Sequence, residues 1–211
     1  MTSLRDETIL IDSYKTILSP AEAEIKIERS RFVASALPVQ GKVEAEEEYR
    51  RISRKYYDAT HNCFAYVVGH GGDAQFRYSD AGEPGGTAGK PIYDAISSQE
   101  LTFVLVVVTR YFGGIKLGTG GLSRAYRDAA LAVLGKAERI EQYIMNSFRL
   151  RFDHDQISIA MRTLADYSLT ADTTDYSERV TMTGSIRSSW YVKFAHDIID
   201  RSHGKIVIEA I

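Results

Sequence analysis

The spacing of apolar positions along the chain predicts alternating strands and helices. The strongest strand signal is residues 102–109, a run rich in apolar and β-branched side chains. After a glycine-rich loop, apolar residues recur at helical spacing; they are Leu122, Ala125, Tyr126, Ala129, Val133 and Leu134. The other elements expected before residue 140 are strands over 9–18, 23–28, 31–39, 61–68 and 76–78, a helix over 42–57 and a short helix after Pro91.

The last third of the chain has a regular order of its own. Its pattern predicts a strand over 148–152, a helix over 156–167, strands over 169–175 and 179–187, a helix over 191–201 and a strand over 205–211. This βαββαβ order is the ferredoxin-like arrangement, and Gly204 is placed to end its second helix. We therefore expect an α+β protein of two domains, residues 1–140 and 146–211, divided at 140–146.

Composition indicates an ordinary soluble protein, since 44% of the residues are hydrophobic and 26% are charged. The longest strongly apolar run, residues 103–108, is far shorter than a membrane span. The first residues lack the apolar core of a signal peptide. The single cysteine, Cys63, excludes an intrachain disulfide and is typical of a reducing compartment. We expect a cytoplasmic protein without a membrane partner.

Basic residues gather in one part of the chain, although the formal net charge is only -2. Between residues 110 and 139 the acidic residues are Asp128 and Glu138 alone. The basic residues of the same segment are Arg110, Lys116, Arg124, Arg127, Lys136 and Arg139. This local excess surrounds the junction between the apolar strand and the following helix, and it favours an anionic partner there.

The junction itself, residues 110–126 (RYFGGIKLGTGGLSRAY), is rich in glycine. A strand that leads through such a loop into a helix exposes backbone N–H groups at the positive end of the helix, where a phosphate or carboxylate can bind. The loop matches neither a P-loop nor the dinucleotide fingerprint, which would need a glycine at Ser123. The alternative is a tight connection whose helix is capped by Thr119. Our candidate anion-binding or RNA-binding residues are Arg110, Tyr111, Gly113, Gly114, Lys116, Gly118, Gly120, Gly121 and Arg124.

A second glycine-rich segment, residues 80–91 (DAGEPGGTAGKP), carries other candidate chemistry. Asp80 and Glu83 could serve in acid–base work or hold a metal with His61. The alternative is a loop ordered by hydrogen bonds from the backbone to these carboxylates. The candidates at this second loop are His61, Asp80, Glu83, Thr87 and Lys90, with Thr87 as a cap for the next helix. We expect the two glycine-rich loops to be neighbours in space.

Cys63 shares a strand face with His61. A nucleophilic thiol is one interpretation, and a buried structural cysteine is the other. Zinc needs about four ligands and no second cysteine is present. We predict no metal and no cofactor.

Three segments, residues 61–66 (HNCFAY), 80–91 and 110–126, resemble the bacterial YigZ-type branch of the IMPACT family. The resemblance extends over essentially the whole chain, in order. It implies a first domain with the fold of the fourth domain of elongation factor G and a second domain similar to the fifth. Eukaryotic members carry an extra N-terminal interaction domain, for which this chain has no room.

Two functions follow as hypotheses. The first is an RNA-binding or ribosome-binding, translation-related regulatory protein that uses the basic glycine-rich surface. The alternative is an enzyme acting on a small anionic or phosphorylated substrate at the two loops. An open basic stripe would favour RNA, and a deep pocket lined by the candidate groups would favour the enzyme. The sequence indicates neither a particular reaction nor an oligomeric state.

Overall fold

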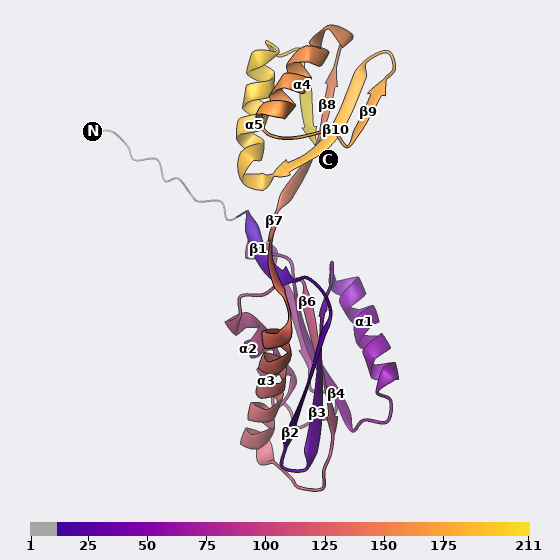
Figure 1. Ribbon diagram of the computed structural model, residues 1–211, viewed down its shortest axis with the longest axis vertical. Coiled ribbons are helices and arrows are strands. Elements are labelled where there is room, and N and C mark those ends of the chain that lie inside the picture. The colour runs from indigo at the N-terminus through magenta and orange to yellow at the C-terminus, as the bar shows by residue number, and fades with distance from the viewer. Residues whose placement is uncertain (1–11) are drawn as a thin grey trace, which may run out of the picture. The chain divides into compact units, whose positions relative to one another are not determined.

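The computed structural model describes residues 12–211 (Figure 1). They form two compact units, one over 14–142 and the other over 143–211 together with residues 12 and 13. Residues 9–11 of the first expected strand lie outside the described residues. Separate folding of two domains stays a prediction. Within the described residues, no helix has both the length and the apolar composition that crossing a membrane requires.

The first unit is built on a five-stranded antiparallel sheet with the order β2-β3-β6-β4-β5. Helices α2 and α3 cover one face of this sheet, and α1 covers the other (Figure 1). The strands are β2 (Ala21–Ile27), β3 (Ser30–Pro38), β4 (His61–Val68), β5 (Gln75–Ser79) and β6 (Val104–Tyr111). The helices are α1 (Lys42–Lys55), α2 (Gly89–Ser98) and α3 (Gly118–Lys136), with a 3-10 turn η1 (Gly71–Asp73).

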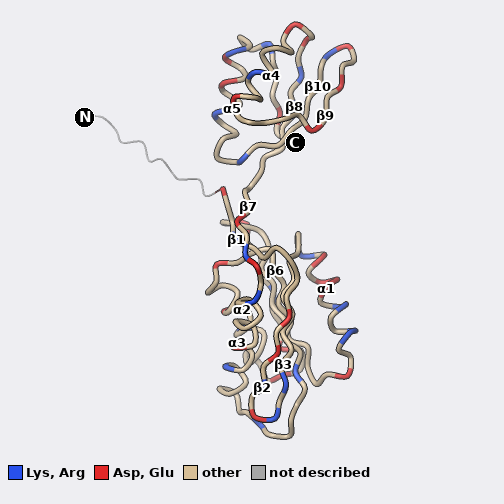
Figure 2. Tube along the Cα trace, viewed as in Figure 1, with Lys and Arg blue, Asp and Glu red and all other residues tan. Residues whose placement is uncertain are grey.

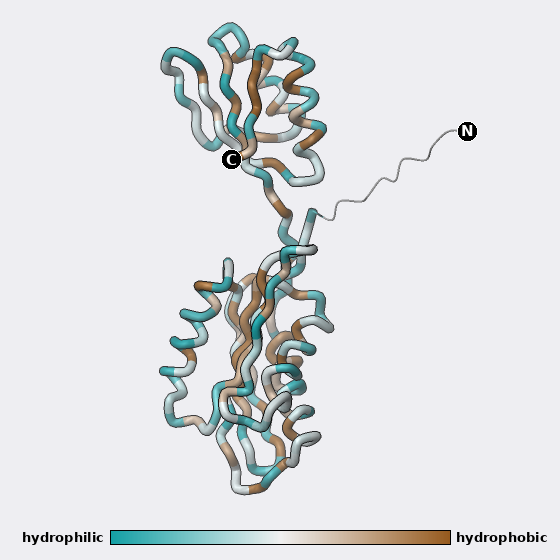
Figure 3. Tube along the Cα trace, turned by 180° about the vertical axis from the view of Figure 1, so that it is seen from behind, coloured by the Kyte–Doolittle hydropathy of each residue, from teal (hydrophilic) through white to brown (hydrophobic). Residues whose placement is uncertain are grey.

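Strand β6 is central in this sheet, and both of its faces are covered by helices. Residues 104–108 are therefore fully buried, which explains why they form a continuous apolar run rather than an alternating one. Figure 3 shows the hydrophobic positions of this unit concentrated on its inner strands.

Several elements begin at other residues than the sequence predicts: the strands expected from 148 and 169 begin at Met145 and Thr173, and the helix expected from 191 begins at Ser188. Two further differences have a physical reason. Helix α2 begins at Gly89 rather than after Pro91, because proline is well tolerated in the first turn of a helix. Strand β7 (Arg139–Tyr143) was not expected; it pairs with β1 (Ser13–Ile17) in a two-stranded sheet. Its residues are mostly exposed, so no apolar alternation marks it in the sequence.

The second unit is a four-stranded antiparallel sheet with the order β11-β8-β10-β9. Phe148, Phe152 and Phe194 are fully buried between this sheet and its two helices. Its elements are β8 (Met145–Phe152), the 3-10 turn η2 (His154–Gln156), α4 (Ile157–Asp166), β9 (Thr173–Tyr176), β10 (Val180–Arg187), α5 (Ser188–Arg201) and β11 (Val207–Ala210). Gly204 follows α5 with a φ of 77°, as expected for a glycine that ends a helix.

Asp12 joins the second unit through side-chain hydrogen bonds. Its carboxylate accepts from Nε and Nη2 of Arg187, each at 3.2 Å, and from the hydroxyl of Ser189. The bonds from Ser189 and Arg187 lower the pKa of Asp12. The Arg187 guanidinium also lies 3.6 Å from the ring centroid of Tyr143 and 5.3 Å from that of Trp190.

Candidate functional site

The two glycine-rich loops meet at one pocket of about 470 Å³ in the first unit. The pocket lies where β4 begins, β6 ends and α3 begins. Its polar lining residues are Thr60, His61, Glu83, Arg110, Lys116 and Thr119. The remaining lining residues are Pro84, Phe112, Leu117, Gly118 and Leu122. The two loops are therefore neighbours, as the sequence analysis expected.

A buried ion pair between Arg110 and Glu83 forms part of the pocket wall. Arg110 lies in register between His61 on β4 and Phe32 on β3, so strand alternation directs its side chain to the face under α3. Its Nη1 donates to Oε1 of Glu83 at 2.6 Å, and the two side chains are only 6% and 3% exposed. Arg110 is thus not the exposed cation that the sequence suggested, because Glu83 already balances its charge.

Tyr126 completes the surroundings of the Glu83 carboxylate. The Tyr126 hydroxyl donates to Oε1 of Glu83 at 2.8 Å. Burial, together with the neighbouring Cys63 and Glu83, raises the pKa of Tyr126 far above its usual value of 10.0. The phenol therefore remains protonated and acts as a hydrogen-bond donor. Tyr126 is fully buried, as its place among the apolar positions of the helix predicts, but the spacing gives no sign of its bond to Glu83.

His61 lies at the edge of the same cluster, and one of its ring nitrogens is bonded to the backbone. Its Nδ1 lies 2.9 Å from the carbonyl oxygen of Ala81. A carbonyl only accepts hydrogen bonds, so Nδ1 carries a hydrogen and donates it. Nε2 lies 4.0 Å from Oε2 of Glu83. The second ring nitrogen of His61 is therefore close to the Glu83 carboxylate in the pocket wall.

Cys63 is a structural residue. It is fully buried, and its Sγ donates to the carbonyl oxygen of Asp80 at 2.9 Å. Burial raises the pKa of the thiol to about 12, so the nucleophilic thiolate is not formed at neutral pH. Within residues 12–211 there is no group of three or more His, Cys, Asp and Glu side chains arranged to hold a metal ion.

Asp80 orders the loop that precedes α2. Its carboxylate accepts from the backbone N–H groups of Gly86 at 2.8 Å, Ala88 at 2.9 Å and Gly89 at 2.8 Å. Burial by itself would raise the pKa of Asp80, but these three bonds hold it below its usual value of 3.8. Asp80 therefore orders its loop by accepting backbone hydrogen bonds, which was the alternative to a role in acid–base chemistry or metal binding.

The roles expected for Thr87 and Lys90 are corrected. Helix α2 has Ala88 as its N-cap residue and no side-chain cap at that position. The Thr87 hydroxyl instead donates to the carbonyl oxygen of Pro84 at 2.7 Å. Lys90 forms an ion pair with Asp94, one helical turn further on, at 2.7 Å. Of the second-loop candidates, only His61 and Glu83 line the pocket.

Asp80→Ala is expected to lower the free energy of unfolding by about 1 kcal/mol at pH 7, as the loss of a helix cap does. Because folding lowers the pKa of Asp80, its contribution is present above pH 3.8 and is lost as the pH falls through the folded-state value. The difference between wild type and variant should therefore shrink as the pH falls from 7 to 3. Urea unfolding across that range measures it, with Asp94→Ala as the control. A loss of unfolding free energy that does not depend on pH would contradict the role of the ionised Asp80 carboxylate in ordering the loop.

Helix α3 begins beside the pocket without a side-chain cap. Its first residue is Gly118, with a φ of 68°, and its N-cap residue is Leu117, whose side chain makes no capping bond. Thr119 therefore does not cap the helix, contrary to the alternative considered above. Lys116 is exposed, lines the pocket and forms no ion pair with any of residues 12–211. A free cation and an uncapped helix N-terminus thus border the same cavity.

Six candidates of the first glycine-rich loop do not line the pocket: Tyr111, Gly113, Gly114, Gly120, Gly121 and Arg124. The Tyr111 hydroxyl donates to Asp58 at 2.9 Å and its ring lies 4.3 Å from the Arg31 guanidinium, because neighbouring strand residues point to opposite faces. Arg124 is exposed but is not part of the lining. Phe112, which is not among the sequence-based candidates, also lines the pocket and is 46% exposed. Its only signal was its place at the start of the glycine-rich loop.

Comparison with known proteins identifies the family to which the chain belongs. Residues 28–134 match the Impact N-terminal domain. The chain is 34% identical to the IMPACT family member YvyE of Bacillus subtilis, over 93% of this chain and 90% of that protein. It is 28% identical to the IMPACT family member YigZ of Escherichia coli, over 95% and 99% of the two chains. A crystal structure of a hypothetical protein matches with a TM-score of 0.72 and 28% identity, over 96% of this chain and 98% of the other. This chain therefore belongs to the IMPACT family.

Proposed function

We propose that the protein binds RNA, free or in the ribosome, through phosphate contacts at the pocket between the glycine-rich loops, and that this binding serves a translation-related regulatory role. The observation that carries the proposal is the uncapped start of α3 beside the unpaired Lys116. Backbone N–H groups at a helix N-terminus and a lysine ammonium both favour a phosphate. Phe112, exposed at the rim, offers a ring on which a base can stack.

The architecture supports the same proposal. The order β11-β8-β10-β9 and the βαββαβ sequence of elements favour a ferredoxin-like second domain. We also propose that the first domain shares the fold of the fourth domain of elongation factor G, and that the second is similar to the fifth. Both of those domains contact the ribosome, and by analogy we propose ribosomal RNA as the ligand.

We assign the RNA contact to the first unit. An RNA-recognition sheet stacks bases on aromatic residues of its central strands. In the second unit, the sheet face away from the core carries Ser147, Arg149, Arg151, Thr181 and Thr183 on its central strands β8 and β10. These side chains provide no stacking platform.

Lys116→Ala is expected to weaken binding of single-stranded RNA to a similar extent for A-rich, U-rich and mixed sequences, because a phosphate contact carries no base information. The slope of log affinity against log salt should fall by about 1. Fluorescence anisotropy with labelled oligonucleotides at several salt concentrations measures both quantities. Lys136→Ala, which removes the same charge from the other end of α3, is the matched control. Equal slopes for the two variants would contradict the proposal.

A second candidate function rests on the same cavity. His61 presents Nε2 beside the Glu83 carboxylate in the wall of a concave pocket, an arrangement that could serve acid–base chemistry on a small anionic or phosphorylated substrate. A thermal-shift screen of phosphorylated metabolites against wild type and His61→Gln distinguishes the two candidates. Stabilisation by a metabolite that depends on His61 favours an enzyme, whereas RNA binding should not need the imidazole.

A further inference from the structure

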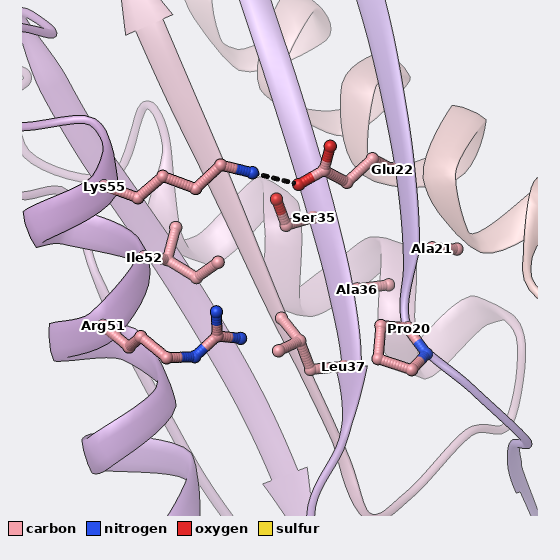
Figure 4. A pocket seen from close by; sticks show the side chains of 9 residues that line it. All are labelled: Pro20, Ala21, Glu22, Ser35, Ala36, Leu37, Arg51, Ile52 and Lys55. Carbon is pink, nitrogen blue, oxygen red and sulfur yellow. Dashed lines mark hydrogen bonds and ion pairs between the residues drawn. The ribbon is translucent and has the colours of Figure 1, made fainter.

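A second groove lies on the opposite face of the same sheet, between α1 and the strands β2 and β3 (Figure 4). Helix α1 packs mainly over β4 and β6, which leaves room beside it for a cavity of about 330 Å³. This volume is at the lower end of the range for small-ligand pockets. None of its lining residues belongs to the pocket between the glycine-rich loops.

A buried hydroxyl without a partner is the first sign of a ligand. Ser35 on β3 lines the groove and is only 3% exposed, yet its Oγ has no hydrogen-bond partner among residues 12–211. Ser35 pairs with Glu22 in the register of β3 with β2, and Figure 4 shows the ion pair that joins Lys55 to Glu22 across the groove. Buried polar atoms normally have partners, because leaving one unpaired is costly. A ligand in the groove would supply the missing acceptor.

The cations of the groove retain free donors. Figure 2 shows basic residues in the C-terminal half of α1. Lys55 donates to Glu22 at 2.7 Å, and Arg51 donates to Glu48 through Nε at 2.8 Å and through Nη2. An ammonium has three N–H donors and a guanidinium has five, so both side chains can donate further. Among residues 12–211, Glu22 is the only acidic residue in the lining. Donors therefore exceed acceptors, and the site suits a ligand rich in acceptors.

The remaining lining is apolar. Leu37 and Ile52 belong to the buried cluster under α1 and also line the groove, with Pro20 and Ala36 beside them. We propose that this groove binds a small amphipathic carboxylate. Its carboxylate oxygens accept hydrogen bonds from the Ser35 hydroxyl and from the free N–H groups of Arg51 and Lys55, and its short hydrocarbon chain packs against Leu37 and Ile52.

Hexanoate is a suitable probe, and its binding to the full-length protein can be followed by the backbone amide shifts of Ser35, Leu37 and Ile52 in NMR spectra. Hexanoate should give saturable shifts at these residues. Hexan-1-ol, which has the same chain length without the charge, should bind about tenfold more weakly, since hydrogen bonds to a charged group are the stronger ones. Hexylammonium should not bind there. The measurement uses no RNA, so its result is independent of the proposed function.

Two substitutions with matched controls locate the site. Ser35→Ala should weaken hexanoate binding about fivefold to tenfold while leaving the fold intact. Ser53→Ala, which removes another buried and unpartnered hydroxyl outside the lining, should not. Arg51→Gln should also weaken binding, whereas Arg54→Gln, an exposed site on the same helix outside the lining, should not. If Ser35→Ala fails to fold, the hexanoate affinity of Arg51→Gln alone tests the site. The proposal would be overturned if hexanoate gave no saturable shift or if hexan-1-ol bound equally well. It would also be overturned if the Ser35→Ala and Arg51→Gln variants folded and bound hexanoate like wild type.

Discussion

Replacing Glu83 with alanine is expected to lower the free energy of unfolding by about 3–5 kcal/mol, one of the two largest effects expected here. The substitution leaves the Arg110 guanidinium buried without its anion, and an uncompensated buried charge is strongly destabilising. It also removes the acceptor of the fully buried Tyr126 hydroxyl. Urea unfolding followed by circular dichroism measures the change.

The control for this variant is an ion pair on the surface. Lys15 and Glu100 approach each other to 2.7 Å, but their side chains are 57% and 76% exposed. Glu100→Ala should therefore cost less than about 1 kcal/mol. The double variant Glu83→Ala with Arg110→Ala should cost less than the sum of the two single changes, because it removes both charges together. If Glu83→Ala lowered the free energy of unfolding no more than Glu100→Ala does, the buried pair of Arg110 and Glu83 would not stabilise the fold as we infer.

Gly113→Ala should likewise be strongly destabilising, and it should also disrupt the pocket. A Cβ at this position would lie 1.9 Å from the carbonyl carbon and oxygen of Arg29, a separation that only a backbone shift can relieve. Overpacking of this kind typically costs about 1–3 kcal/mol. The shift would move the adjacent Phe112 and the loop that carries Lys116, so RNA binding should weaken together with stability.

Gly120→Ala is the matched control for this effect. The added methyl group would meet nothing within 4 Å, and Gly120 lies inside α3 without a positive φ. Alanine is the better helix former by about 1 kcal/mol, so this variant should be as stable as wild type or more stable. Equal unfolding midpoints for the two glycine variants would show that the close approach of Gly113 to Arg29 does not constrain the loop.

Most of the fold could be predicted from periodicity because core positions follow it closely. The central run of β6 and the apolar side of α3 are buried as their spacing predicts. Strand β7 could not be predicted, because its residues face solvent and its place depends on pairing with β1, more than a hundred positions earlier. The starts of α2 and α3 also differed from expectation, since side chains that appear suited to capping bond elsewhere or not at all.

The location of the candidate site was more predictable than the roles of its residues. Glycine and charge pointed to the two loops that meet at the pocket. The pairing of Arg110 with Glu83 joins residues 27 positions apart, and no local pattern encodes it. Strand alternation does predict the face on which Arg110 lies, because Arg110 is an even number of positions from Val106 and Val108, which pack under α2 and α3. Tyr111 has the opposite parity, which assigns it to the other face of the sheet.

The packing of Trp190 against Arg187 has a spectroscopic consequence. Trp190 is the only tryptophan in the chain, and it lies on α5 in the second unit. Its intrinsic fluorescence therefore reports on the contacts around Arg187, including the bonds from Asp12. Substitutions at Glu83 or Gly113 change a unit that contains no indole. Comparing tryptophan emission with circular dichroism thus separates the unfolding of the two units in one unmodified protein.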